Sequence, residues 1–389
     1  MSLETGVARG EAELLALGRI QAWAFGFAES RARAWLDKSG LENVRVARRG
    51  GEILGGLLEI PMGQWFGGRS VPMLGIAGVA VAPAARGEGV ALTLMVDALR
   101  AARSRGFVLS TLYPAAVALY RAAGYEYAGH RYRYKADLKT LPAARDDLRV
   151  APLEPSAAGA VEALYRSVAA ERAGYLDRGT YVWRRVCENH DGEPNHAYGI
   201  WGASGLEGYA YLSQRGPDEQ RELVVNDFAA ATAAAATRLL ALFADHRSTM
   251  KTLAFAGGAP TPLILAPTEP LFRIDHTDTW MTRVLDPLGA LAARGYPELE
   301  TAVDLELTDR VLPENSGRYR LEVSGGRAEV TRGGTGAVAL DERALAALYT
   351  GLFAPAALAR GANLAGDAVS LGRLATLFAG PSPSLCDYF

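Results

Sequence analysis

Residues 79–91 read VAVAPAARGEGVA, a strand-like run that gives way to a proline, an arginine and two glycines. The apolar run up to Val81 is typical of a strand, and Pro83 cannot donate to a β-ladder. A helix that begins after Gly89 leaves its first backbone N–H groups unpaired and has a positive dipole end, so this turn can hold an anion. Gly87 and Gly89 allow the close approach that a diphosphate requires. An ordinary strand-to-helix turn, with glycine for geometry alone, is the alternative.

The segment after these glycines has the periodicity of an amphipathic helix. Gly106 is expected to follow its C-cap, and basic residues gather near that end, where they complement the helix dipole. The expected apolar face consists of Leu92, Met95, Val96, Leu99 and Ala102, and the basic residues are Arg100, Arg103 and Arg105.

Outward from this turn, the first part of the chain predicts the order helix, strand hairpin, strand, helix, strand, helix, strand. Residues 11–38 have helical spacing, and Gly50-Gly51 joins two strands within residues 44–60. FGGR at 66–69 predicts a second turn, and GGTG at 333–336 is also interpreted as a hairpin turn. The later elements are expected at 107–114 (strand), 115–125 (helix) and 126–138 (strand).

The same element order begins again near residue 148, without recognisable sequence repetition. Its crossover, NDFAAATAA at 226–234, has neither glycine nor arginine, and we expect side chains, Phe228 the bulkiest, to block the helix start. A third region is expected from 279–296 onward, with strands before helices. The predicted domains are therefore 1–145, 146–285 and 286–389.

The composition narrows the possible functions. A length of 389 residues favours two or three domains, and a net charge of -2 gives no overall basic face for nucleic acid. Cys187 and Cys386 form no CxxC pair and suggest a reducing compartment. With no signal peptide and no apolar run long enough to span a bilayer, we expect a cytoplasmic protein without a membrane partner. No metal is expected, because metal-ligand spacing is lacking among His130, His190, His196, His246 and His276.

The turn sequence resembles the acetyl-coenzyme A loop of the GNAT superfamily of acyltransferases, whose pattern is R/Q-x-x-G-x-G/A. Arg86, Gly89 and Ala91 occupy the defining positions. In that family the preceding strand diverges from its neighbour, and the exposed backbone pairs with the pantetheine. The resemblance implies acetyl-coenzyme A contacts at Val79, Ala80, Val81, Arg86, Gly87, Glu88, Gly89, Val90, Ala91, Leu92, Ala115 and Ala116.

The segment LYPAAVALYRAAGYEYAG at 112–129 is similar to the ending of GNAT domains, in which a tyrosine protonates the departing thiolate. Its first motif tyrosine is Tyr120, and the resemblance assigns the general acid there. Tyr125 and Tyr127 are the alternatives within the same motif.

The whole chain resembles the Eis (enhanced intracellular survival) family of N-acetyltransferases. That resemblance implies a mixed α/β (α+β) chain with two tandem GNAT folds, the second degenerate, followed by a sterol-carrier-protein-like α+β domain. It also implies a homo-hexamer, and a general base formed by the main-chain carboxylate of the last residue, here Phe389. We expect three apolar or aromatic side chains, Leu385, Tyr388 and Phe389, to dock this end, and Asp387 is a candidate contact for the amine.

In the Eis family the first helical region walls the amine pocket. Trp23, Phe25, Phe27 and Trp35 gather in that region here, but the acidic residues that hold polycationic amines in relatives are not matched near residues 25–28. The resulting hypothesis is transfer of an acetyl group from acetyl-coenzyme A to a primary amine of a polyamine-like or aminoglycoside-like molecule, or of lysine. The alternatives are a lipid- or small-molecule-binding protein that uses its C-terminal domain, and a pure assembly role.

Overall fold

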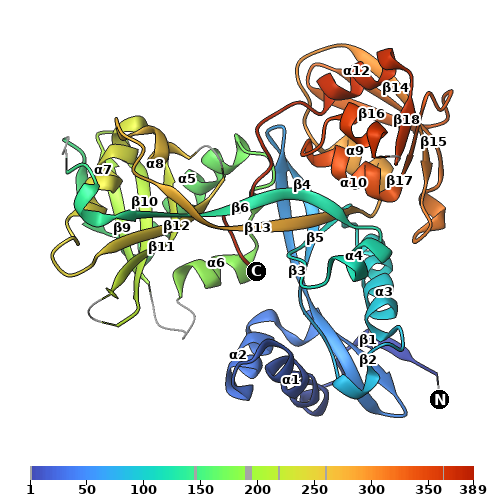
Figure 1. The fold of residues 1–389 in the computed structure, drawn as a ribbon, viewed down its shortest axis with the longest axis horizontal. Coiled ribbons are helices and arrows are strands. Elements are labelled where there is room, and N and C mark those ends of the chain that lie inside the picture. Colours follow the sequence, from blue (N-terminus) through green and yellow to red (C-terminus); the bar gives the residue numbers. More distant parts are fainter. Residues whose placement is uncertain (1, 144–146, 189–194, 218–219, 259–260, 362) are drawn as a thin grey trace. The chain divides into compact units, whose positions relative to one another are not determined.

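A computed structural model describes residues 2–143, 147–188, 195–217, 220–258, 261–361 and 363–389 (Figure 1). The expected boundary at 145/146 and His190 lie outside these residues. The chain forms two compact units. Unit 1 consists of residues 1–128, 279–380 and Phe389, and unit 2 consists of residues 129–278 and 381–388.

The central sheet of unit 1 has the strand order β1-β2-β3-β4-β5-β13. Its strands are β1 (Glu4–Val7), β2 (Val44–Arg49), β3 (Glu52–Phe66), β4 (Arg69–Val81), β5 (Leu109–Leu112) and the end of β13 (Arg273–Val284). Both predicted turns are confirmed: Gly50-Gly51 and Gly67-Gly68 all have positive φ, the conformation that tight hairpins favour and glycine adopts without strain.

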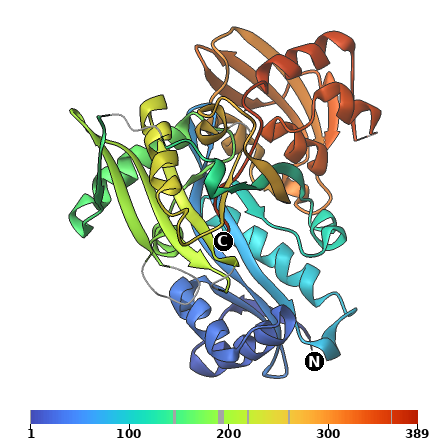
Figure 2. The same cartoon turned by 60° about the vertical axis from the view of Figure 1, so that its left-hand side comes forward.

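The helices of this part are α1 (Glu11–Phe25), α2 (Glu29–Ser39), α3 (Val90–Ser104) and α4 (Val117–Ala122). α3 packs along β2, β3 and β4, as the cyan helix beside the blue strands shows (Figure 2). Gly106 has a φ of 88° after the C-cap, as expected. The buried face of α3 is rotated relative to the prediction, because Val90, Leu94 and Ala98 are buried whereas Leu92 and Val96 are only half-buried.

The remainder of unit 1 is a second sheet, of order β16-β15-β14-β17-β18, with helices packed beside it. GGTG is a crossover connection and not the expected hairpin turn, because the strand that follows it pairs in parallel with β14. The elements are β14 (Thr301–Thr308), β15 (Gly317–Ser324), β16 (Arg327–Arg332), β17 (Val338–Asp341), β18 (Leu364–Gly366), α9 (Pro287–Ala293), α10 (Glu342–Thr350), α11 (Pro355–Arg360) and α12 (Ala368–Leu377).

Unit 2 repeats the mixed sheet, in the order β6-β12-β11-β10-β9-β7, around its own apolar core. Its strands are β6 (Glu126–Asp137, from residue 129 onward), β7 (Arg149–Pro152), β8 (Leu176–Asp177), β9 (His196–Gly202), β10 (Gly205–Arg215), β11 (Glu222–Ala230) and β12 (Thr252–Gly257). Its helices are α5 (Ala158–Ala170), α6 (Thr180–Cys187), α7 (Ala233–Ala244) and α8 (Pro262–Leu265).

The two units share the ends of two strands. In unit 1 the last residues of β13, Met281–Val284, pair with β5, and in unit 2 the later part of β6, residues 132–137, pairs with β12. Residues 279–284 are therefore a strand of unit 1 and not the start of a third region. The three-domain division stays a prediction.

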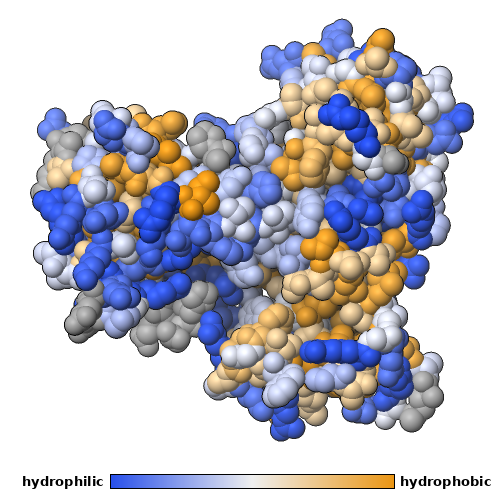
Figure 3. Space-filling view, in the orientation of Figure 1, coloured by the Kyte–Doolittle hydropathy of each residue, from blue (hydrophilic) through white to orange (hydrophobic). Residues whose placement is uncertain are grey.

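In the described part of the chain, no helix is long and apolar enough to cross a membrane. On the face drawn in Figure 3, apolar surface over α1 and α2 is interrupted by hydrophilic groups. Trp23, in α1, is 75% exposed.

Candidate active site

The expected divergence of β4 from its neighbour is present in unit 1. β4 and β5 pair in parallel from Met73–Leu109 to Gly75–Thr111 and no further, while β4 stays paired with β3 as far as Val81. Beyond Gly75, the edge of β4 therefore has no strand of the described residues beside it on the β5 side. Such an edge offers backbone donors and acceptors to an extended amide ligand.

A β-bulge shapes the same part of β4. The pairing register shifts between Gly56 and Leu58, opposite Gly78, whose φ of 60° is left-handed. The Gly78 carbonyl accepts a hydrogen bond from Gln21 Nε2 at 2.8 Å, which fixes the bulge to α1. Of the predicted contact residues here, Ala80 is buried, and Val79 and Val81 are half-buried.

The glycine turn follows after a short 3-10 helix, Pro83–Ala85. Gly87 and Gly89 have φ values of 82° and 78°, and a Cβ on either would meet no atom within 4 Å. Glycine is therefore required by the backbone conformation and not by crowding, and open space lies beside both residues. Arg86 Nε donates to the Val81 carbonyl at 3.3 Å, which ties the turn to the end of β4.

α3 begins at this turn without a side-chain cap, because its N-cap residue is Gly89. The first N–H groups of the helix and the positive end of its dipole thus point out of an open, exposed turn, which suits a diphosphate. The Val90 side chain lies in the core, so only its backbone is available to a ligand. The other predicted residues are exposed (Arg86, Gly87, Glu88, Gly89) or half-buried (Ala91, Leu92).

The far side of the split is formed by the residues after β5. Ala115 and Ala116 are exposed, and Ala116 is the N-cap residue of α4. Neither carries a side chain that could obstruct a ligand lying between the two strands. The predicted contact residues in β4, in the turn and after β5 thus all belong to unit 1.

The three candidate tyrosines differ in their surroundings. Tyr120, on α4, is 5% exposed, and its hydroxyl has no hydrogen-bond partner among the described residues; burial raises its pKa to about 12. The Tyr125 hydroxyl lies 2.7 Å from Ser110 Oγ, and the residue is fully buried. Tyr127 is half-buried beneath the Arg121 guanidinium, 5.0 Å from the ring centroid. The Tyr125 hydroxyl is therefore engaged by Ser110, whereas the buried, protonated hydroxyl of Tyr120 is free to act toward a ligand.

Phe389 lies at the point where the split opens. Its ring is 5.9 Å from that of Tyr113, between centroids, and only 5% of the residue is exposed. A Cβ on Gly75, the last β4 residue paired with β5, would lie 2.8 Å from Phe389 Cε2. Gly75 thus makes room for the ring. Leu385 is also buried, as expected, but Tyr388 is 52% exposed.

Three of the four aromatic residues of the first helical region form a cluster. The rings of Phe25, Phe27 and Trp35 have centroids 5.8 to 6.1 Å apart. A Cβ on Gly78 would lie 3.0 Å from Trp35 Cη2, so this cluster borders the bulge of β4. Trp23 is not part of the cluster.

The start of α7 in unit 2 differs from the glycine turn in unit 1. α7 begins at Thr232, whose side-chain oxygen accepts a hydrogen bond from the Ala235 N–H at 3.0 Å, so its first turn is already capped. The Phe228 ring packs against that of Phe255, with the centroids 5.5 Å apart, and its blocking of the helix start stays a prediction. Asp387 is 7% exposed and is paired with Arg178, which argues against the expected amine contact.

Metal ligands are not grouped in the part of the chain that the structure describes, where no set of three or more His, Cys, Asp or Glu residues could hold an ion. Sequence reasoning gave no role to Gly75 or Gln21, although both shape the split. Gly75 and Phe389 lie more than three hundred positions apart in the sequence, so no local pattern predicts their contact.

Comparisons with known proteins agree with this geometry. Models of an acetyltransferase (GNAT) domain match residues 10–128 and 174–284, and a sterol carrier protein domain matches residues 288–386. No curated protein sequence gives a significant match.

Solved structures match over the full length of the chain. A GCN5-related N-acetyltransferase from Anabaena variabilis is 33% identical, with both chains fully covered and a TM-score of 0.95. One from Kribbella flavida is 31% identical, covering 100% of this chain and 98% of that one, with a TM-score of 0.86. The chain therefore belongs to the GCN5-related N-acetyltransferases, with two GNAT domains and a sterol carrier protein domain.

The resemblance to the Eis family is confirmed at the level of the fold. Eis1 from Mycobacterium abscessus is 22% identical, with both chains fully covered and a TM-score of 0.81.

Proposed function

We propose that the protein transfers the acetyl group of acetyl-coenzyme A to a primary amine, at the split between β4 and β5. The acceptor is a small polyamine-like or aminoglycoside-like molecule, or a lysine side chain. The single observation that carries the proposal is the end of β4–β5 pairing at Gly75, beside an uncapped α3 that begins at Gly89. The open space at Gly87 and Gly89 fits a diphosphate.

Two groups handle the protons in this proposal. The acceptor amine gives a proton to the main-chain carboxylate of Phe389, and its nitrogen bonds to the thioester carbonyl carbon. The carbon–sulfur bond then breaks, and the Tyr120 hydroxyl gives its proton to the thiolate. A pKa of about 12 keeps Tyr120 protonated at neutral pH, which supports the acid role.

Holding both substrates in one split would supply much of the remaining acceleration, because a correctly oriented pair reacts as a single molecule. The aromatic cluster of Phe25, Phe27 and Trp35 borders the bulge of β4 and is our candidate wall for the acceptor pocket. A homo-hexamer remains a prediction from the family resemblance, and light scattering tests it. A cytoplasmic location remains a prediction from the sequence composition.

The experiment is a screen of primary amines with acetyl-coenzyme A, read out as release of free thiol. Tyr120→Phe should lower kcat by about 100- to 10,000-fold with little change in acetyl-coenzyme A affinity, since only the proton donor is removed. Tyr127→Phe is the matched control and should retain full turnover. If Tyr125→Phe abolishes turnover and Tyr120→Phe does not, the acid is wrongly assigned. Absence of thiol release with every amine class named above would contradict the proposed function.

A further inference from the structure

Unit 2 contains a split like that of unit 1, but it is filled. β11 and β12 pair in parallel from Glu222–Thr252 to Val225–Phe255 and no further, although β11 continues to Ala230. A cavity of about 20 Å³ remains beside the unpaired part of β11 and Ala256. A volume of that size holds about one water molecule.

The C-terminal segment, residues 381–388, lies at this split. Ser384 forms a parallel bridge with His130 of β6, and the Leu385 N–H donates to the His130 carbonyl at 3.2 Å. On its other side the Ser384 N–H donates to the Ala173 carbonyl at 2.9 Å. Cys386 lines the small cavity itself. The segment thus occupies unit 2 much as an added strand would.

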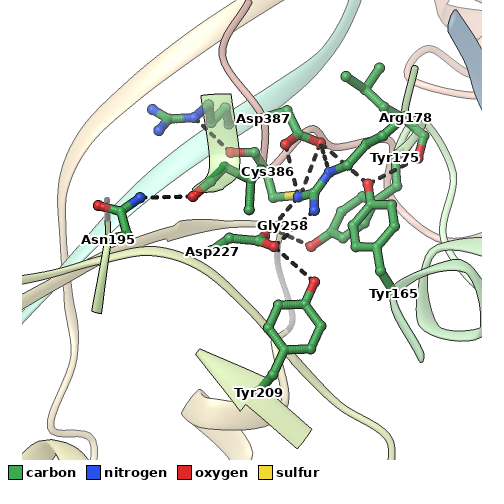
Figure 4. Close-up of polar contacts among 12 residues, drawn as sticks. Tyr165, Tyr175, Arg178, Asn195, Tyr209, Asp227, Gly258, Cys386 and Asp387 are labelled. Atoms are coloured by element: carbon green, nitrogen blue, oxygen red, sulfur yellow. Dashed lines mark hydrogen bonds and ion pairs between the residues drawn. The ribbon is translucent and has the colours of Figure 1, made fainter. Parts of the chain in front are cut away.

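A buried ion-pair cluster holds the end of this segment (Figure 4). The Arg178 guanidinium donates to both carboxylate oxygens of Asp227, at 2.8 and 2.7 Å, and its Nη2 lies 2.8 Å from Asp387 Oδ1. Tyr209 donates to Asp227 at 2.8 Å, and the Tyr165 hydroxyl lies 3.2 Å from Asp387 Oδ2. One arginine therefore links a strand of unit 2 to the C-terminal segment.

Arg178 is itself fixed from several sides. Its side chain is 1% exposed, and its guanidinium carbon lies 3.6 Å from the ring centroid of Tyr165 and 4.7 Å from that of Trp183. Burial alone would lower the pKa of Arg178, but the charges of Asp227 and Asp387 raise it, so the cation persists. A planar, stacked guanidinium that binds Asp227 with both arms has little freedom to move.

We propose that unit 2 acts as a clamp for the C-terminal segment, and that Arg178 is its positioning residue. Asp387 precedes Phe389 by two residues, so a fixed Asp387 confines the chain end to within about 7 Å. Without the clamp, that end would fray like most chain termini. An effect of the clamp on turnover rests on the proposed function, in which the Phe389 carboxylate is the base. The binding of the C-terminal segment by unit 2 does not depend on that function.

The test is Asp387→Asn, which keeps the side-chain size and leaves the Arg178–Asp227 pair intact. Asp275→Asn is the matched control, because it breaks an arginine pair of unit 2 (Arg133, 2.8 Å) away from the C-terminal segment. Gly258→Ala is a second, uncharged disruption, since its Cβ would overlap Ser384 Oγ. Carboxypeptidase A is added to each folded 389-residue protein, and the rate of release of Phe389 is measured.

We expect Asp387→Asn and Gly258→Ala to raise the release rate about tenfold or more, because a charge-assisted contact or a backbone anchor is lost. Both variants should also lower kcat with the KM for acetyl-coenzyme A unchanged. Faster release of Phe389 with unchanged kcat would support the clamp and would contradict the role of the Phe389 carboxylate as the base. Release as slow as in the unaltered protein, or equally fast in Asp275→Asn, would overturn the clamp.

Discussion

Gly75→Ala tests whether the position of Phe389 matters for turnover. In the structure, the added Cβ would lie 2.8 Å from Phe389 Cε2 and 3.0 Å from Cδ2. Carbon atoms in ordinary contact are about 3.5 to 4.0 Å apart, so the ring must move by roughly 1 Å. A displacement of that size at a reacting group lowers turnover on the order of 100-fold. Overpacking of this kind also destabilises a fold by about 1–3 kcal/mol.

The assay is thiol release at saturating acetyl-coenzyme A, with cofactor affinity measured separately by calorimetry. Met62 Cε also lies where the new Cβ would sit, so Met62→Ala/Gly75→Ala relieves that second conflict and leaves the one with Phe389. We expect the double variant to stay as slow as Gly75→Ala, and Met62→Ala alone to stay active. Full turnover in Gly75→Ala, or its recovery in the double variant, would refute the role of Phe389.

Three further predictions concern the chain end, the buried cluster and pH. Extra residues after Phe389 convert its carboxylate to an amide, so a C-terminal tag should abolish acetylation while an N-terminal tag should not; full activity of the extended chain would exclude this base. Arg178→Met removes the cation that pairs with two buried carboxylates and should lower the free energy of unfolding by about 3–5 kcal/mol, measured by urea titration; a loss below about 1 kcal/mol would contradict the described pairing. Because burial raises the pKa of Tyr120 to about 12, the unfolded chain releases that proton first, so stability should fall as pH rises above about 10. Tyr120→Phe should lose less stability between pH 9 and 11, and an equal loss would argue against the raised pKa.

Local signals predicted much of the fold of unit 1. The glycine pairs Gly50-Gly51 and Gly67-Gly68 determine their turns through backbone conformation alone. The turn at Arg86–Gly89 could be predicted from the strand pattern before it and the helix pattern after it. The division of β6 and β13 between the two units could not be predicted. Both segments have the pattern of ordinary strands, and only tertiary pairing decides their partners.

The sequence predicted those parts of the site that lie within one segment of the chain. It did not predict contacts between segments that are distant in the sequence. Tyr120, Tyr125 and Tyr127 lie in one motif, in which the family resemblance assigns the acid to Tyr120, and the hydrogen bond between Tyr125 and Ser110 commits the Tyr125 hydroxyl elsewhere. Arg178 gave no signal, since its partners lie 49 and 209 positions away. GGTG failed as a hairpin because glycine allows a crossover connection as readily as a tight turn.

The most direct measurement is a calorimetric titration of acetyl-coenzyme A into the unaltered protein and into Gly89→Glu. The new side chain has open space, and the strain of a non-glycine residue at a φ of 78° is about 1–2 kcal/mol, which leaves the fold intact; its carboxylate would stand where the diphosphate is expected. Gly106→Glu is the matched control, because Gly106 has a similar φ and equal space at the opposite end of α3. We predict one site per chain, lost in Gly89→Glu and kept in Gly106→Glu. Two sites per chain, or unchanged affinity in Gly89→Glu, would contradict a single acetyl-coenzyme A site at this turn.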